Sequence, residues 1–123
     1  MIRGVLLDEH YYEWWPGAIT AAVPWLDVRS VDDPDAPASG TKDPQILEWL
    51  ETNQFILVTD NRSTMLGHLG DFNAQGHHVL GIFIAAKDLN IRIVAEDLEM
   101  IVGASLPEEF QDQIRFLPLP ELH

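Results

Sequence analysis

The sequence IRGVLL, residues 2–7, is a short apolar run that stops abruptly at Asp8 and Glu9. A second stretch, FILVT at residues 55–59, ends at Asp60 in the same way. An apolar run with acids directly behind it is typical of a buried strand that delivers carboxylates at its carboxyl end. We therefore predict two buried β-strands, each followed by an acidic side chain.

Three further segments are rich in Val, Ile, Leu or Phe, which favours β-structure. We predict strands over residues 27–31, 78–85 and 114–117. Helical spacing of apolar residues predicts helices over residues 43–53, 62–75 and 90–102. Residues 11–23 are predicted to be helical in part, with an interruption at Pro16 and Gly17.

Strands that alternate with helices indicate an α/β protein. We predict a three-layer sandwich in which helices cover both faces of a mostly parallel, five-stranded sheet. In such sheets, ligands bind outside the carboxyl ends of the strands. Asp8 and Asp60 are both predicted to project there. The length of 123 residues fits one domain, residues 1–123.

Composition excludes several classes of function. The chain has no cysteine, which rules out disulfides, thiolate nucleophiles and Cys-ligated metals. Twenty acidic against seven basic residues give a net charge of −13, which opposes tight nonspecific binding of nucleic acid. The same charge is compatible with a divalent metal site. Because the first apolar run is too short for a signal or a membrane span, we expect a soluble cytoplasmic protein.

Asp43 has two interpretations that do not exclude each other. It precedes Pro44, which suits the first position of a helix, so Asp43 is a natural helix cap. It is also an acid that opens a helix between two predicted strands, from where it can join a metal site.

Several motifs occur in one order along almost the whole chain: LLDEH at 6–10, DPQILEWL at 43–50, ILVTDNRSTM at 56–65, GHHVLGIFI at 76–84, IRIVAEDLEMIV at 91–102 and RFLPL at 115–119. Together they resemble the PIN-like family of small toxin-associated proteins, which is related to the VapC-type PIN-domain ribonucleases. The resemblance implies a parallel α/β sandwich whose acids bind Mg²⁺ or Mn²⁺ and hydrolyse RNA phosphodiesters.

Carried over to this sequence, the resemblance makes Asp8 the acid after the first strand, Asp43 the acid that opens the next helix, and Asp60 the acid after the following strand. The family often writes the third motif as Thr-x-Asp. That spacing aligns its aspartate with Asn61 and leaves Asp60 one place early.

These acids form the predicted catalytic site. Asp8 is the central metal ligand, Asp43 and Asp60 complete the site, and Glu9 is an alternative or outer ligand. Phosphodiester cleavage needs a water nucleophile near neutral pH and compensation of charge on the transition state. A carboxylate-bound divalent ion supplies both.

Three residues near Asp60 are predicted to contact the substrate. Arg62 is placed to meet a phosphate, and Thr59 and Ser63 are placed to orient water or substrate.

The predicted function is that of a Mg²⁺- or Mn²⁺-dependent endoribonuclease, the toxin of a toxin–antitoxin pair, with RNA as substrate and a small antitoxin as partner. Two alternatives stay open. The charge of −13 and the Asn61 departure favour a non-catalytic PIN-like interaction module. A metal-dependent phosphatase or nuclease acting on small nucleotides would tolerate the acidic surface better than an enzyme acting on long RNA.

Other residues are assigned to surfaces. The aromatic segment Tyr11–Trp15 is predicted to contribute to the core and to a surface for a partner or a second copy, with base stacking as the alternative. His77 and His78 are predicted to lie in a loop, and His68 has no evident partner. Glu96 and Asp97 are predicted on a solvated helix face, with a role as a fourth metal acid as the alternative.

Overall fold

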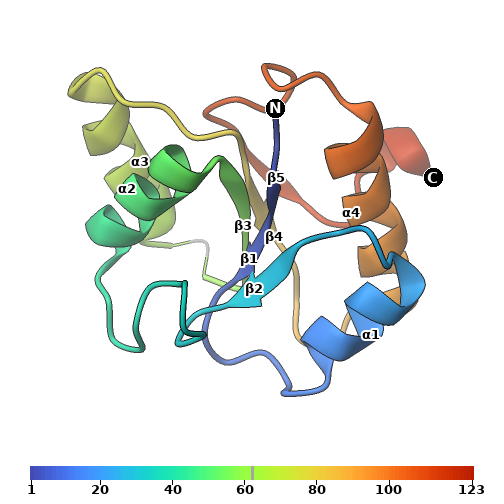
Figure 1. Ribbon diagram of the computed structural model, residues 1–123. Coiled ribbons are helices and arrows are strands. Elements are labelled where there is room, and N and C mark those ends of the chain that lie inside the picture. The colour runs from blue at the N-terminus through green and yellow to red at the C-terminus, as the bar shows by residue number, and fades with distance from the viewer. Residues whose placement is uncertain (62) are drawn as a thin grey trace.

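The computed structural model describes residues 1–61 and 63–123, and Figure 1 shows their arrangement. Arg62, predicted to meet a phosphate, lies outside the described residues. None of the described helices combines the length and apolarity needed to cross a membrane.

A parallel sheet forms the centre of the protein. The described residues contain five strands in the order β2-β1-β3-β4-β5, and every neighbouring pair is parallel. The strands are β1 (Gly4–Leu7), β2 (Val28–Ser30), β3 (Phe55–Thr59), β4 (Ile82–Ile84) and β5 (Ile114–Phe116). All lie within the segments predicted to be strands. β4 is shorter than predicted because the backbone N–H groups of His78 and Val79 donate to the carboxylates of Glu51 and Asp112 instead of to a strand.

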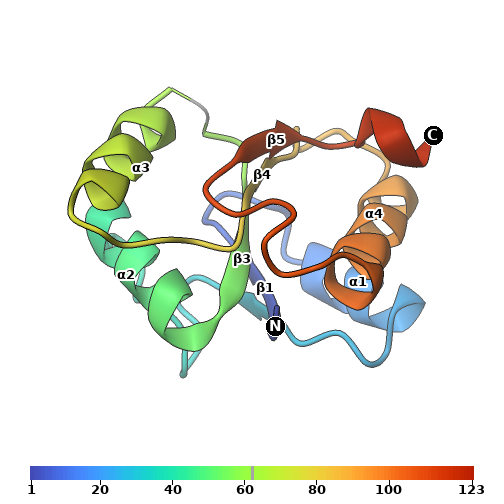
Figure 2. The same ribbon diagram turned by 90° about the horizontal axis from the view of Figure 1, so that it is seen from above.

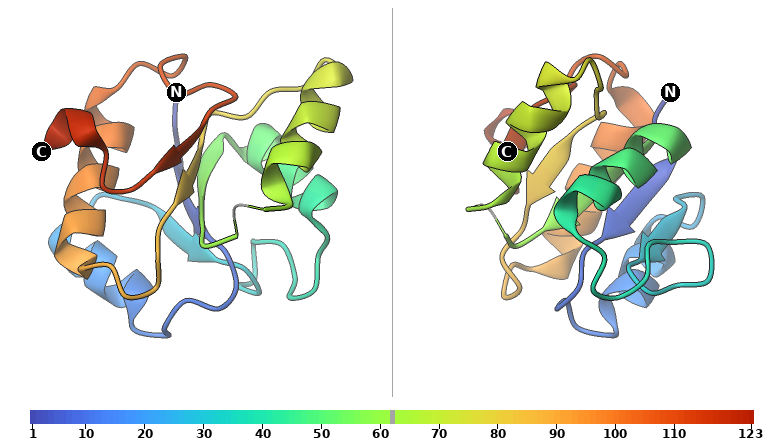
Figure 3. Two further views of the ribbon diagram at one scale, coloured as in Figure 1. Left: turned by 180° about the vertical axis from the view of Figure 1, so that it is seen from behind. Right: turned by 90° about the vertical axis from the view of Figure 1, so that its left-hand side faces the viewer.

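Helices cover both faces of the sheet, which confirms the three-layer α/β sandwich. The helices are α1 (Trp15–Ala22), α2 (Asp43–Asn53), α3 (Met65–Ala74), α4 (Ile91–Ala104) and a 3₁₀ turn, η1 (Pro120–Leu122). Seen from above, α1 and α4 lie on one side of the sheet and α2 and α3 on the other (Figure 2). The right-hand view of Figure 3 shows α2 and α3 side by side over their face.

Apart from Thr59 at the end of β3, the central strands are apolar because both of their faces are covered. Side chains alternate between the two apolar layers along each strand. In β1, Val5 and Leu7 join the layer under α1 and α4, while Leu6 joins the layer under α2 and α3. In β3, Ile56 and Leu57 divide in the same way. Side chains that point to opposite faces are therefore both apolar, and the sequence shows a continuous apolar run instead of alternating polar and apolar residues.

Two predictions about helix starts are wrong. Pro16 does not interrupt α1, because it sits in the first turn, where a missing N–H group removes no helical hydrogen bond. Asp43 does not cap α2: Lys42 holds the cap position, and the helix begins at Asp43 itself. The Asp43 carboxylate instead accepts a hydrogen bond from Thr64, next to α3.

Candidate active site at the carboxyl edge of the sheet

Asp8 follows β1 at the carboxyl edge of the sheet, beside the end of the neighbouring strand β3. The Thr59 hydroxyl donates to Asp8 Oδ2 at 2.7 Å, and the Glu9 backbone N–H donates to Asp8 Oδ1 at 2.8 Å. Thr59 is itself completely buried. The Asp8 carboxylate is therefore held at a fixed place by a rigid strand end.

A chain of hydrogen bonds leads from Asp8 to Asp43. The Asn61 backbone N–H donates to Thr59 Oγ1 at 3.1 Å, and the Asn61 side-chain amide donates to Thr64 Oγ1 at 3.0 Å. The Thr64 hydroxyl in turn donates to Asp43 Oδ2 at 3.2 Å. We call Asp8, Thr59, Asn61, Thr64 and Asp43 the acid–hydroxyl chain. It joins residues that follow β1 and β3 to the starts of α2 and α3.

Two further side chains contact this chain. The Ser63 hydroxyl donates to Asn61 Oδ1 at 3.3 Å, which places this predicted substrate contact beside the site. His68 Nε2 lies 3.8 Å from Asp43 Oδ2. His68 was predicted to have no partner. That prediction is wrong because α3 packs beside α2 and brings His68 to the start of that helix.

Electrostatics at Asp8 disfavour its ionised form. Burial raises the pKa of the Asp8 carboxyl, and the negative charges of Asp43 and Glu9 raise it further. Hydrogen bonds from the Thr59 hydroxyl and the Glu9 N–H lower it, but the pKa remains above its ordinary value. A cation bound beside Asp8 would oppose the effects of burial and of the neighbouring negative charges, and would favour the carboxylate form.

Glu9 is engaged by the loop that follows β2. Its Oε2 accepts a hydrogen bond from the Ser39 hydroxyl at 2.8 Å, and its Oε1 accepts one from the Gly40 N–H at 2.9 Å. These bonds hold the pKa of the Glu9 carboxyl below its ordinary value. Glu9 therefore connects the end of β1, next to Asp8, to this loop through two hydrogen bonds.

Asp60 forms an ion pair with Lys87. Its Oδ2 lies 3.6 Å from Lys87 Nζ, beyond the end of β4. Asp60 nevertheless remains close to the site: burial raises the pKa of the Tyr11 phenol, and the charges of Asp60 and Asp8 raise it further. The next residue, Asn61, is the one that joins the chain. This is the position at which the Thr-x-Asp spacing expects an aspartate.

The donor set suits a hard divalent cation. Within the described part of the chain, no three His, Asp or Glu side chains form a ready cluster that could hold a metal ion. Mg²⁺ keeps several waters and takes one or two carboxylates, and oxygen donors also suit Mn²⁺. Asp8 and Asp43 are the two carboxylates at the ends of the acid–hydroxyl chain, and their oxygens are the donor type that such an ion takes.

A cavity of about 300 Å³ opens beside Asp8. It is lined by Leu7, Asp8, Glu9, His10, Tyr11, Tyr12, Glu13, Pro16, Ser30, Val31 and Asp33. Four of these lining residues are acidic, and two carry phenol rings. The site thus offers a ligand both negative charge and aromatic surface.

Sequence analysis missed Thr64, which links Asn61 to Asp43. A hydroxyl residue in a short loop between a strand and a helix is common, and by itself it indicates a turn. The available signal was the matched pair Thr59 and Asn61, whose spacing fits the Thr-x-Asp motif. That pair identified position 61 as an alternative to Asp60.

The prediction of Asp97 as a solvated residue is wrong. Asp97 is 1% exposed, accepts the Leu119 N–H at 2.8 Å, and lies 2.7 Å from His123 Nε2. The cause is the C-terminal segment, which folds back over α4 and covers it. Glu96 is exposed, as predicted.

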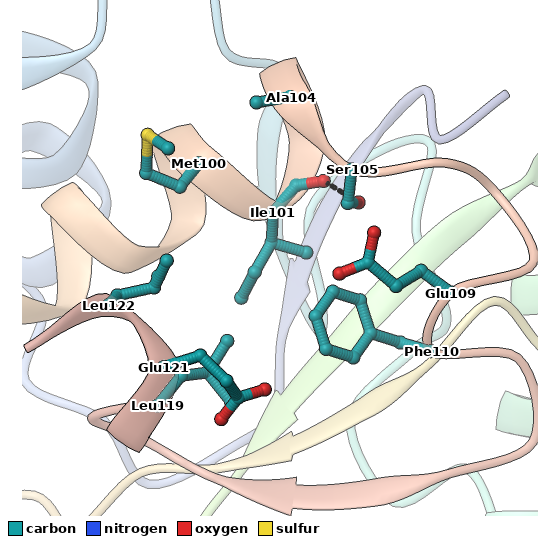
Figure 4. Close-up of a pocket in the computed structure, with 9 residues that line it drawn as sticks. All are labelled: Met100, Ile101, Ala104, Ser105, Glu109, Phe110, Leu119, Glu121 and Leu122. Atoms are coloured by element: carbon teal, nitrogen blue, oxygen red, sulfur yellow. Dashed lines mark hydrogen bonds between the residues drawn. The ribbon is translucent and has the colours of Figure 1, made fainter.

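A second cavity, of about 140 Å³, lies between α4 and the C-terminal segment (Figure 4). Its lining is mostly apolar and includes Met100, Ile101, Phe110 and Leu122. The Ser105 hydroxyl there is bonded back to the Ile101 carbonyl of its own helix. Because most of the lining of this cavity is apolar, the carboxyl edge is the better candidate for chemistry.

Comparison of the chain with family models, curated proteins and solved structures gives no match. The case for a function therefore rests on the geometry of the acid–hydroxyl chain and on the resemblance carried by the sequence motifs.

Proposed function

We propose that this protein is a divalent-cation-dependent phosphodiester hydrolase that cleaves RNA, with its active site on the acid–hydroxyl chain. The observation that carries the proposal is the hydrogen-bonded connection between Asp8 and Asp43 through Thr59, Asn61 and Thr64. It couples two carboxylates from distant parts of the sequence at the edge where parallel α/β sheets bind their ligands.

Asp8 and Asp43 would hold Mg²⁺ or Mn²⁺ through carboxylate oxygens. When bound, such an ion supplies a reactive water near neutral pH and compensates charge on the phosphoryl group. The protein's own contribution is orientation. Thr59 and the Glu9 N–H fix Asp8, and Thr64 fixes Asp43. Mutation of residues that orient metal ligands in this way typically costs about 10- to 100-fold in metal affinity or activity.

The state of Asp8 supports this assignment. A half-buried carboxyl whose pKa is raised by burial and by neighbouring acids is an unfavourable arrangement for folding alone. Groups perturbed in this way gather at functional sites. Cation binding requires the carboxylate form, so an ion would remove the penalty and couple binding to stability.

RNA as the substrate, and a small antitoxin as the partner, rest on the resemblance to the PIN-like family. The charge of −13 favours a second candidate, in which the site acts on small nucleotides. A long strand brings many phosphates to an acidic surface, whereas a single nucleotide brings one. The cavity beside Asp8 is at the small end of the range for ligand pockets, roughly 300–1,000 Å³.

The test compares purified wild type with Asp8→Asn, Asp43→Asn and the control Asp71→Asn. Asp71 is exposed on α3, so its substitution makes the same change in charge away from the acid–hydroxyl chain. Each protein is incubated with labelled single-stranded RNA, and separately with mononucleotides, in Mn²⁺, in Mg²⁺ and in EDTA. We expect metal-dependent cleavage of RNA by wild type and Asp71→Asn, and its loss in the other two variants.

Other outcomes would separate the candidates. Turnover of mononucleotides without RNA cleavage would favour the second candidate. Metal binding that depends on Asp8 without turnover of either substrate would indicate a non-catalytic module. Cleavage that survives Asp8→Asn would contradict the site itself.

A further inference from the structure

The aromatic segment between β1 and α1 divides into an inner and an outer pair. Tyr11 and Trp15 form the inner pair, with stacked rings whose centroids lie 4.4 Å apart. Trp15 is completely buried, and the Tyr11 hydroxyl donates to the Ala85 carbonyl at 2.7 Å, beyond the end of β4. The inner pair therefore anchors this segment to the core and to the carboxyl edge of the sheet.

The outer pair is exposed. Tyr12 and Trp14 are 52% and 55% exposed, and their rings stack at 5.7 Å with an interplanar angle of 13°. The ring centroid of Trp14 also lies 6.4 Å from that of the buried Trp15. The outer rings are thus held in place by the anchored inner pair, which lowers the entropy lost when a ligand stacks on them.

Tyr12 belongs to the cavity that contains Asp8. Both residues line it, together with His10 and Glu13. A flat group that contacts the part of Tyr12 that lines the cavity therefore lies in the same cavity as the proposed metal ligand. Trp14 does not line this cavity, but it stacks on Tyr12 and supports its orientation.

We propose that Tyr12, supported by Trp14, is the stacking platform for one nucleobase of the substrate. This inference rests on the proposed function and adds its recognition element. A neutral base suits the cavity because the acidic lining repels any phosphate whose charge no bound cation compensates, whereas every base presents a π-face to an aromatic ring. Stacking thus supplies binding that the net charge of −13 does not oppose.

The cavity of about 300 Å³ matches one nucleotide unit better than a length of strand. That unit can be a free nucleotide or one nucleotide of single-stranded RNA, since both present the same base. We therefore test three ligands: an RNA oligomer, adenosine 5′-monophosphate, and adenosine, which has no phosphate and needs neither metal nor hydrolysis for its binding.

The decisive variants are Tyr12→Ala and Tyr12→Phe, with Trp25→Ala as the matched control. Trp25 is 56% exposed, as the outer pair is, but it rests against Gly103 on α4 and does not line the cavity. Loss of one stacked base weakens binding by about 5- to 100-fold. We expect Tyr12→Ala to raise KM for RNA by that factor with little change in kcat. Tyr12→Phe keeps the aromatic ring and should retain most of the affinity that Tyr12→Ala loses, whereas the control Trp25→Ala should resemble wild type.

An RNA oligomer with an abasic nucleotide beside the cleaved bond checks the mechanism. Wild type and Tyr12→Ala should cleave it with the same KM, because no base remains to stack. An unchanged KM in Tyr12→Ala on intact RNA, or an equal loss on the abasic oligomer, would overturn the platform while leaving the hydrolase in place.

Adenosine binding, followed by saturation-transfer NMR in EDTA, separates this inference from the hydrolase. Binding by wild type that is lost in Tyr12→Ala would support the platform even for a protein that cleaves nothing. Cleavage of RNA without adenosine binding at Tyr12 would overturn the platform alone. Saturable hydrolysis of the phosphomonoester bond of adenosine 5′-monophosphate, which releases adenosine and phosphate, would identify the free nucleotide as the source of the base if it is again sensitive to Tyr12→Ala.

Discussion

Acidic side chains at the two edges of the sheet have opposite electrostatic surroundings, which raise the pKa of Asp8 and lower that of Asp112. At the carboxyl edge, Asp8 is held by a hydroxyl and a backbone N–H, and Asp43 and Glu9 add negative charge to its surroundings. At the amino edge, acids meet histidines. Glu51 Oε1 lies 2.9 Å from His77 Nδ1, and Asp112 Oδ2 lies 2.6 Å from His78 Nδ1.

At the amino edge, both carboxylate oxygens of Asp112 have hydrogen-bond partners. Asp112 Oδ1 accepts hydrogen bonds from the Val79 N–H and the Asn73 amide, both at 2.9 Å. Burial alone would raise the pKa of the Asp112 carboxyl. The bonds from Val79, His78 and Asn73 outweigh burial and lower the pKa. The network ties the loop before β4 to the loop before β5, so its role is structural.

The difference shows how the same residue type serves two purposes. Where an acid is fully hydrogen-bonded, its charged form stabilises the fold and its pKa falls. Where it is half-buried among other acids, its charged form is disfavoured and its pKa rises. Proteins retain the second arrangement where function requires it, at the expense of stability. The expected results below test that contrast.

The largest effect on stability is expected at the amino edge. Asp112→Ala removes three hydrogen bonds and puts alanine at a φ of 59°, in the left-handed region. We expect the free energy of unfolding to fall by about 2–4 kcal/mol. Urea denaturation measures this change. Asp112→Asn, which retains one oxygen and tolerates this φ, should lose less than half as much. A loss equal to that of Asp112→Ala would contradict a role for the hydrogen bonds.

At the carboxyl edge, Asp8→Asn is expected to stabilise the protein. The folded-state pKa of Asp8 lies above its unfolded value of 3.8, so ionisation costs stability once the pH exceeds both values. We expect a gain of less than about 1 kcal/mol at pH 7, since solvent still screens the carboxylate. Urea denaturation from pH 7 to pH 3 measures it.

The gain from Asp8→Asn should shrink as the pH falls through the raised folded-state pKa toward 3.8, and it should vanish below 3.8, where Asp8 is protonated in both states. Wild type with excess Mn²⁺ provides the control, because a bound cation should remove the advantage of the variant. A destabilised Asp8→Asn at neutral pH would contradict the contrast between the edges.

The smallest effect is expected at Asp60. Its ion pair with Lys87 is partly exposed, and such pairs contribute little. Asp60→Asn should change the free energy of unfolding by less than about 0.5 kcal/mol and retain most of the metal-dependent activity. Asn61→Ala should lose more activity, since it breaks the acid–hydroxyl chain. Cleavage rates measured side by side for the two variants test this expectation. A larger loss of activity in Asp60→Asn than in Asn61→Ala would indicate that Asp60 is the third acid of the site.

The sequence was sufficient for most of the fold. The apolar runs that end at Asp8 and Asp60 predicted β1 and β3, and the spacing in residues 43–53 predicted the whole of α2. These predictions succeed because they depend on local patterns, namely continuous burial in a two-sided sheet and a period near 3.6 in a helix. They fail where a distant segment intervenes, as the C-terminal segment does by covering Asp97.

For the candidate site, the sequence by itself determined that acids and hydroxyls follow β1 and β3. Strand order, which only the tertiary structure decided, places those two strand ends side by side. It also puts Asn61 in the acid–hydroxyl chain and puts Asp60 beside Lys87. The Thr59 hydroxyl accepts the Asn61 N–H and holds that residue in the chain, while Lys87, beyond the end of the adjacent strand β4, lies beside Asp60. A sequence lists neighbours along the backbone, and the choice between these two residues depends on neighbours across the sheet.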